Sequence, residues 1–219
     1  MEVFLMDALK KNTFGRFCNF CYYWVEGKDS EGKRRKKRIS AVSEDSAVKK
    51  AEAGGLVGPF KVEAAPLDPP TERQLALAER KDFSVPEGCT KEDLGVMISR
   101  DIDFDGDIDP DPGIVQYAKD CEVCFSSFVG ESGLLQCMIS QLSLRDRAVL
   151  FAYAVSLSQS GDQRFGDPRI SKKIRAFEQF ADMVASDPSL KKSLEERGLN
   201  DYQSPNTRSK AYKAVMSCL

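Results

Sequence analysis

The chain has 219 residues, of which 42% are hydrophobic, so it carries enough apolar mass for one large domain or two small ones. Its formal net charge of −2 hides an uneven distribution, because residues 1–66 carry 13 Lys and Arg against 9 Asp and Glu, whereas residues 67–113 carry 5 against 13. The chain contains no histidine, which excludes catalytic triads, Cys–His dyads and metal sites that depend on imidazole.

A β-β-α-β module is predicted for the N-terminal residues 1–65. Residues 17–25 form an aromatic run and residues 35–42 end in β-branched side chains, which indicates a β-hairpin with a polar turn. Ser43 then occupies the N-cap position of a helix that ends at Gly54. Residues 60–62 are typical of a third strand.

A proline-rich linker, residues 66–70, is predicted to separate this module from a mainly helical domain over residues 71–219. Thr71 and Thr90 are placed to cap two short helices, the second with Asp93 where a capping box usually has Glu or Gln. Further helices are predicted over residues 134–142, 149–157 and 205–219, and from the Asp-Pro pairs at residues 167 and 187. The predicted fold class is therefore α+β.

The helical region resembles a known group of proteins. The motifs PTERQ (70–74), PEGCTKEDL (86–94) and ISR (98–100) are similar to a helical module of uncharacterised bacterial and mobile-element proteins. The resemblance covers residues 70–219, through SFVG at 127–130 and AYK at 211–213, and departs at residues 163–166, where the relatives keep histidine. It implies a boundary near residue 70 and, by association, an accessory or inhibitory role in conflict between phage and host. It implies no activity.

The predicted hairpin carries six consecutive cations, which give a strong local potential for phosphates. The module also resembles small strand-strand-helix units that serve as arm-type DNA-binding domains of recombinases and as adaptor domains of secretion-platform proteins. One alternative is a charged edge strand that blocks pairing with other sheets, and another is docking on the acidic segment of the same chain. The candidate contacts for nucleic acid or an acidic partner, including aromatic stacking surfaces, are Lys28, Lys33, Arg34, Arg35, Lys36, Lys37, Arg38, Tyr22 and Trp24.

An acidic loop, residues 101–111, has alternating carboxylates with Gly106 at the turn, as in the calcium loop of an EF-hand. The bidentate carboxylate that such a loop needs at its twelfth position is replaced by Pro112. Two interpretations stay open. The loop is a solvated acidic linker, or it binds calcium through Asp101, Asp103, Asp105 and Asp107.

The remaining sequence features indicate a cytoplasmic protein that is not an enzyme. Seven cysteines favour reduced thiols, and no apolar run approaches the ~20 residues that cross a bilayer. The two CxxC pairs, at Cys18 and Cys21 and at Cys121 and Cys124, suggest zinc or buried thiols. No glycine-rich phosphate loop follows a strand, and no nucleophile has a recognisable context.

We therefore expect a non-enzymatic binding protein that contacts nucleic acid or a nucleic-acid-processing partner, without a membrane and with calcium as the one possible cofactor. The alternatives are a calcium-binding protein that uses residues 101–112, and a protein–protein adaptor that contacts no nucleic acid.

Overall fold

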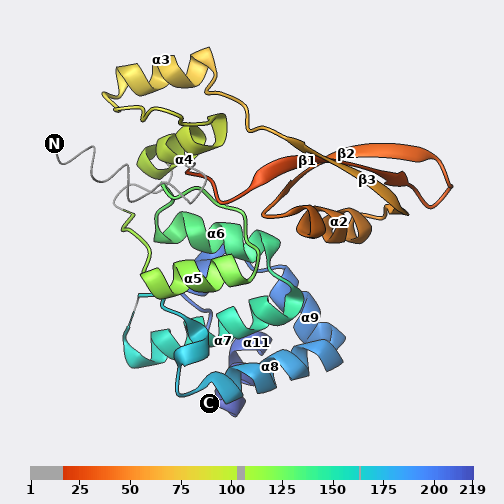
Figure 1. Cartoon of the computed structure of the whole chain (residues 1–219). Coiled ribbons are helices and arrows are strands. Elements are labelled where there is room, and N and C mark those ends of the chain that lie inside the picture. The colour runs from red at the N-terminus through yellow and green to blue at the C-terminus, as the bar shows by residue number, and fades with distance from the viewer. Residues whose placement is uncertain (1–16, 103–106, 163) are drawn as a thin grey trace. The chain divides into compact units, whose positions relative to one another are not determined.

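The computed structural model describes residues 17–102, 107–162 and 164–219. It contains a three-stranded antiparallel sheet near the N-terminus, and the rest of the described chain is mostly helical, which confirms the predicted α+β class (Figure 1). The chain forms two compact units. The first takes residues up to 106 together with 124–129, and the second takes residues 107–123 and 130–219.

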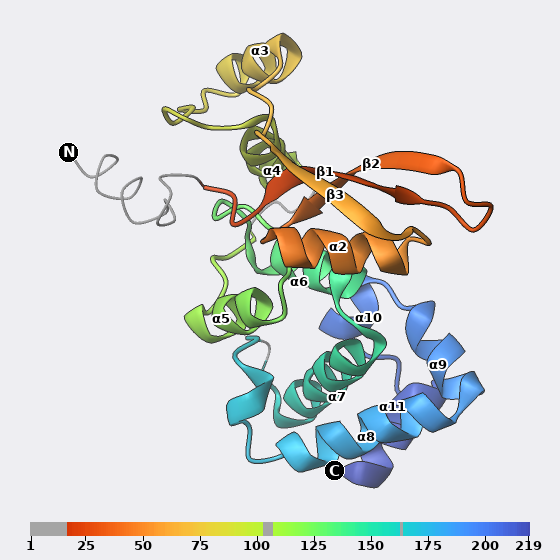
Figure 2. The same cartoon turned by 45° about the vertical axis from the view of Figure 1, so that its right-hand side comes forward.

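The sheet of the first unit has the strand order β2-β1-β3. Side chains of β1 alternate between the two faces, so Tyr23 and Val25 are buried while Trp24 between them is exposed. One helix, α2, lies along the buried face and contributes Ala47 and Ala51 to this core (Figure 2). The bounds are β1 Cys21–Lys28, β2 Arg34–Ala41, α2 Glu44–Ala53 and β3 Val57–Ala65.

The capping residues in the sequence predicted the position of α2 correctly. The Ser43 hydroxyl accepts a hydrogen bond from the Ser46 N–H at 3.1 Å, and Gly54 caps the C-terminus. The first strand is shorter than predicted, because residues 17–20 precede it and bond elsewhere. Asn19 exchanges hydrogen bonds with Phe125, through N–H to carbonyl at 3.1 Å and from the Phe125 N–H to the side chain at 2.8 Å.

Two further helices of the first unit begin at reciprocal caps. The Thr71 hydroxyl accepts from the Gln74 N–H of α3, Glu72–Arg80. At the start of α4, Lys91–Ile102, the Asp93 N–H donates to the Thr90 hydroxyl and the Thr90 N–H donates back to the Asp93 carboxylate. Both predicted caps are thus confirmed, including the unusual one with aspartate.

The proline-rich residues 66–70 join β3 to α3 without regular secondary structure. The helices α3 and α4 group with the sheet in the first compact unit. The Lys91 N–H donates to the Asp68 carbonyl at 2.8 Å, which ties this segment to the start of α4. A linker between independently folding domains at residues 66–70 stays a prediction.

The core of the second unit is built around one long helix, α7. Its Phe151 ring is fully buried and lies 6.2 Å from Phe180 and 5.5 Å from Tyr202, centroid to centroid. No helix of the described residues is long and apolar enough to cross a membrane. The helices are α5 Pro112–Asp120, α6 Glu131–Gln141, α7 Leu144–Ser160, α8 Ile174–Ser186, α9 Pro188–Glu195, α10 Leu199–Gln203 and α11 Lys210–Cys218.

Two predicted helix starts in this unit were wrong. Asp167 and Pro168 open only a short 3-10 helix, Pro168–Ile170, although the Asp167 carboxylate accepts from the Arg169 N–H as an N-cap does, and α8 begins later, at Ile174. The last helix begins at Lys210, with Ser209 as its cap, and not at residue 205. The start at Asp187 and Pro188 is confirmed, since the Asp187 carboxylate accepts from two N–H groups of α9.

Candidate nucleic-acid interface

Strand register decides which of the predicted contact residues lie together. β1 and β2 pair antiparallel, with Trp24 opposite Arg38, Glu26 opposite Lys36 and Lys28 opposite Arg34. Alternate residues of a strand point to opposite faces, and Tyr23 and Val25 of β1 pack with α2. The residues between them therefore project from the other face. We call this face, with its β3 members, the open face: Tyr22, Trp24, Glu26, Lys28, Arg34, Lys36, Arg38, Lys61 and Glu63.

The six consecutive cations do not form one surface. Arg35 and Lys37 alternate with the open-face cations, and the Lys37 ammonium donates to the Gly54 carbonyl at the end of α2, at 2.7 Å. Arg35 binds Asp29 at 2.8 Å, and Lys33, in the turn, pairs with Glu31 at 2.8 Å. Because a strand repeats every two residues, only half of a continuous basic run reaches one ligand-facing surface.

Two aromatic rings support cations on the open face. The Lys36 ammonium lies 5.3 Å from the centroid of the Trp24 ring, and the Arg38 guanidinium lies 3.9 Å from that of Tyr22. Such cation–π contacts hold a charge in place without neutralising it. The Tyr22 hydroxyl donates to Glu92 at 3.1 Å, and burial together with this carboxylate raises the pKa of the Tyr22 phenol. Trp24 keeps 37% of its surface exposed and is the single tryptophan of the chain.

Acidic side chains partly compensate the open face. Glu63 accepts from Lys61 at 2.7 Å and from Lys36 at 3.3 Å, and these two neighbours lower the pKa of its carboxyl group. Arg38 pairs with Asp68 at 3.0 Å. These pairs are solvent-exposed, and exposed ion pairs contribute little to stability. An incoming polyanion can therefore replace the carboxylates at little cost.

The structure also bears on docking of the hairpin on the chain's own acidic segment. Among the described residues, the acidic partners of the hairpin cations are Asp29, Glu31, Glu63 and Asp68, and none of these belongs to residues 101–111.

Three residues of this surface, Lys61, Glu63 and Asp68, were not predicted from the sequence. The alternation of polar with apolar residues along β3 was the available signal for the first two.

The described members of the predicted calcium loop contact other parts of the protein. Asp101, at the end of α4, pairs with Lys81. The Asp107 carboxylate accepts from the N–H groups of Ser132, at 3.0 Å, and Gly133, at 3.4 Å, in the first turn of α6. Asp103 and Asp105 lie outside the described residues. No group of three or more Cys, Asp or Glu that could hold a metal occurs among the residues with described positions, and calcium binding stays a prediction.

The cysteine pairs are placed as separate thiols. All seven cysteines are described and form no disulfide. Cys18 is buried and donates to Asp93 at 3.1 Å, and burial raises the pKa of its thiol. Cys21 belongs to β1. The Cys124 sulfur accepts from the Lys50 ammonium at 3.3 Å, and burial raises the pKa of Cys121 to about 11. Thiols with raised pKa values are poor nucleophiles at neutral pH.

The geometry defines a three-stranded antiparallel sheet with one helix-covered face and one polar face that carries cations and an exposed tryptophan. No family model matches the chain, and neither a curated protein nor a solved structure matches it.

Proposed function

We propose that this chain is a non-enzymatic nucleic-acid-binding protein, and that the open face of its sheet is the contact surface. The observation that carries the proposal is the convergence of Arg34, Lys36 and Arg38 on the same face as the exposed Trp24. Cations at alternate positions of a strand form a row that can follow a phosphate backbone.

Protection of edge strands does not explain the whole pattern. Charges that block pairing between sheets are needed on the two edge strands, which here are β2 and β3. Lys28 lies on the central strand β1, which has no free edge. Cations spread across all three strands are better suited to a ligand that covers the face.

The aromatic residues support the same proposal. The Lys36 and Arg38 side chains rest on rings, so less conformational entropy is lost when they contact a phosphate. The chain also lacks histidine and a phosphate-binding loop after a strand, which supports a binding role in place of catalysis. The resemblance of residues 70–219 to mobile-element proteins is consistent with an accessory or inhibitory role.

Two double variants test the proposal with a matched control. Lys36→Gln with Arg38→Gln removes one Lys and one Arg from the open face, whereas Arg35→Gln with Lys37→Gln removes the same charges from the other face of the same strand. Binding of the full chain to labelled single strands and duplexes is measured by fluorescence anisotropy at two salt concentrations. We expect the first variant to lose about tenfold in affinity at low salt and the second to change little.

The salt dependence gives an independent readout. If three or four phosphates are contacted on a single strand, the logarithm of the association constant should fall with log salt with a slope of about −2 to −3. The first double variant should have a shallower slope. Undetectable binding of every nucleic acid at low salt would refute the proposal and favour a protein–protein adaptor.

A further inference from the structure

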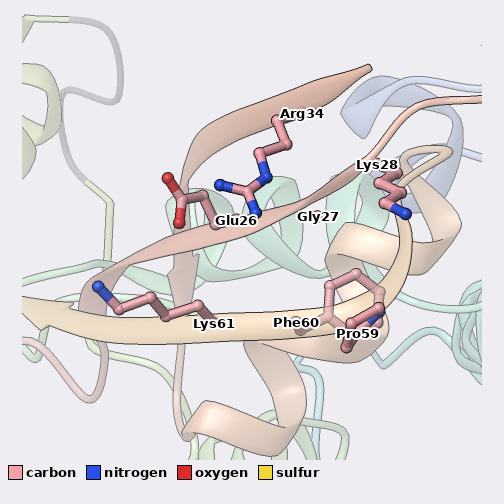
Figure 3. A pocket seen from close by; sticks show the side chains of 7 residues that line it. All are labelled: Glu26, Gly27, Lys28, Arg34, Pro59, Phe60 and Lys61. Atoms are coloured by element: carbon pink, nitrogen blue, oxygen red, sulfur yellow. The ribbon is translucent and has the colours of Figure 1, made fainter. Parts of the chain in front are cut away.

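A hollow of about 330 Å³ lies at one end of the sheet, where open-face residues meet Gly27 and Phe60, which alternate with them along the strands (Figure 3). At this end the pairing of β1 with β3 shifts register between Glu26 and Lys28. At this place Gly27 lies against Phe60, and a Cβ atom on Gly27 would stand 2.9 Å from the ring. The hollow is lined by Glu26, Gly27, Lys28, Arg34, Pro59, Phe60 and Lys61.

Two cations of this hollow differ from the other cations of the hairpin. Lys28 and Arg34 are paired in the register of β1 and β2, and their side chains make no hydrogen bond or ion pair with any residue that the structure describes. Lys61, the third cation of the hollow, pairs with Glu63. Lys33, Arg35, Lys36, Lys37 and Arg38 each have a partner. The two hairpin cations without a hydrogen-bond or ion-pair partner among the described residues therefore both line the hollow.

The hollow also contains a hydrogen-bond acceptor, the carboxylate of Glu26. The Glu26 side chain also makes no hydrogen bond or ion pair within the described residues, and Figure 3 shows the Arg34 guanidinium extending toward it. Pro59 and Phe60 supply an apolar wall from β3, and Phe60 is half-buried because it also packs against the core that α2 covers. A bare phosphate would be attracted by Lys28 and Arg34 but repelled by Glu26. A ligand fits better if it combines a phosphate, an apolar plane and N–H donors.

The volume of the hollow limits the size of the ligand further. At about 330 Å³ it lies near the lower end of the range for small-molecule pockets, which begins at about 300 Å³. We propose that the hollow binds one unpaired nucleotide of a nucleic acid. Its phosphate contacts Lys28 and Arg34, its base lies against Phe60 and Pro59, and the Watson–Crick edge of the base donates to Glu26. This inference rests on the proposed function, which it deepens by selecting single-stranded over fully paired nucleic acid.

The Glu26 carboxylate also predicts which base the hollow should prefer. A carboxylate offers two oxygens, and guanine presents two adjacent N–H donors on its Watson–Crick edge. Guanine should therefore be favoured over thymine or uracil, and Glu26→Gln should remove this preference while strengthening the binding of phosphate alone.

The experiment uses Trp24, whose emission reports on this sheet alone because the chain has no other tryptophan. The full chain is titrated with a guanine-containing single strand, with the same sequence as a duplex, with guanosine monophosphate and with inorganic phosphate. We expect tighter binding of the single strand than of the duplex, and competition by guanosine monophosphate but not by an equal concentration of phosphate. Arg34→Gln should lower the affinity for the single strand about tenfold, which corresponds to one charge-assisted contact.

Arg35→Gln is the matched control, since it removes the same group from the neighbouring position on the other face of the strand. Equal melting temperatures of the variants would show that the sheet is intact. Nucleic-acid binding that is unchanged by Arg34→Gln and unaffected by guanosine monophosphate would refute the proposed nucleotide site in the hollow, and the proposed function would still stand. Equal affinity for duplex and single strand would also overturn it. Failure of the wild type to bind any nucleic acid would refute the proposed function itself.

Discussion

A buried carboxylate, Asp93, is expected to hold the first unit together. Asp93 is fully buried at the start of α4, and all four of its hydrogen-bonding neighbours are donors. One oxygen accepts from Ser126 at 2.6 Å and from Cys18 at 3.1 Å, and the other accepts from the hydroxyl and N–H of Thr90 at 2.7 and 3.0 Å. The side chain thus joins three segments that are distant in sequence.

Asp93→Ala removes this shared acceptor. The Thr90 N–H and the Ser126 hydroxyl are left without it, and each buried group that loses its partner costs about 1–3 kcal/mol. We expect the free energy of unfolding of the first unit to fall by about 2–6 kcal/mol, since two such groups lose their partner. Asp93→Asn should also destabilise this unit, because an uncharged amide offers one acceptor oxygen where the carboxylate offers two.

Urea denaturation followed by Trp24 emission measures this effect, because the single tryptophan lies in the first unit. Glu31→Ala is a suitable control, since it removes a carboxylate of the same unit whose ion pair with Lys33 is exposed. A shift below about 1 kcal/mol for Asp93→Ala would refute the assigned role of this hydrogen-bond network.

Two further predictions concern the second unit and the acidic loop. Glu131 is buried in the first turn of α6, and burial raises the pKa of its carboxyl group. The ionised form is therefore penalised in the folded state, so stability should be lost as pH rises through the raised pKa. Glu131→Gln should melt higher than the wild type at neutral pH and equally below about pH 4; an equal difference at both pH values would contradict this. For the acidic loop, calcium at 100 times its dissociation constant should stabilise the protein by about 2.7 kcal/mol, and Asp101→Asn with Asp107→Asn should abolish this gain. A melting temperature that does not respond to millimolar calcium would dismiss the calcium hypothesis.

Much of the local structure could be predicted because its causes are local. The caps at Ser43, Thr71 and Thr90 bond to backbone groups within the next few residues, so the printed sequence contains both partners. The same reasoning failed at Asp167, where the cap and Pro168 were correct signals but the helix that they start is a single 3-10 turn, and α8 begins at Ile174.

The candidate site was only half predictable. The basic run and Trp24 were visible as residues, but the separation of Arg34, Lys36 and Arg38 from Arg35 and Lys37 needed the position of α2 on one face. The hollow could not be predicted, because it depends on the pairing of β1 with β3, which brings together residues more than 20 positions apart.

The sequence by itself determined the class of fold, the hairpin, most helix starts and the presence of a concentrated positive charge. Tertiary structure decided which charges have no hydrogen-bond or ion-pair partner among the described residues, as is the case for Lys28 and Arg34. It also decided which carboxylates, such as Glu63 and Asp93, neutralise or organise their neighbours. The physical reason is that hydrogen-bond register and side-chain packing join segments far apart in the chain, and these contacts set the electrostatic surroundings of each residue.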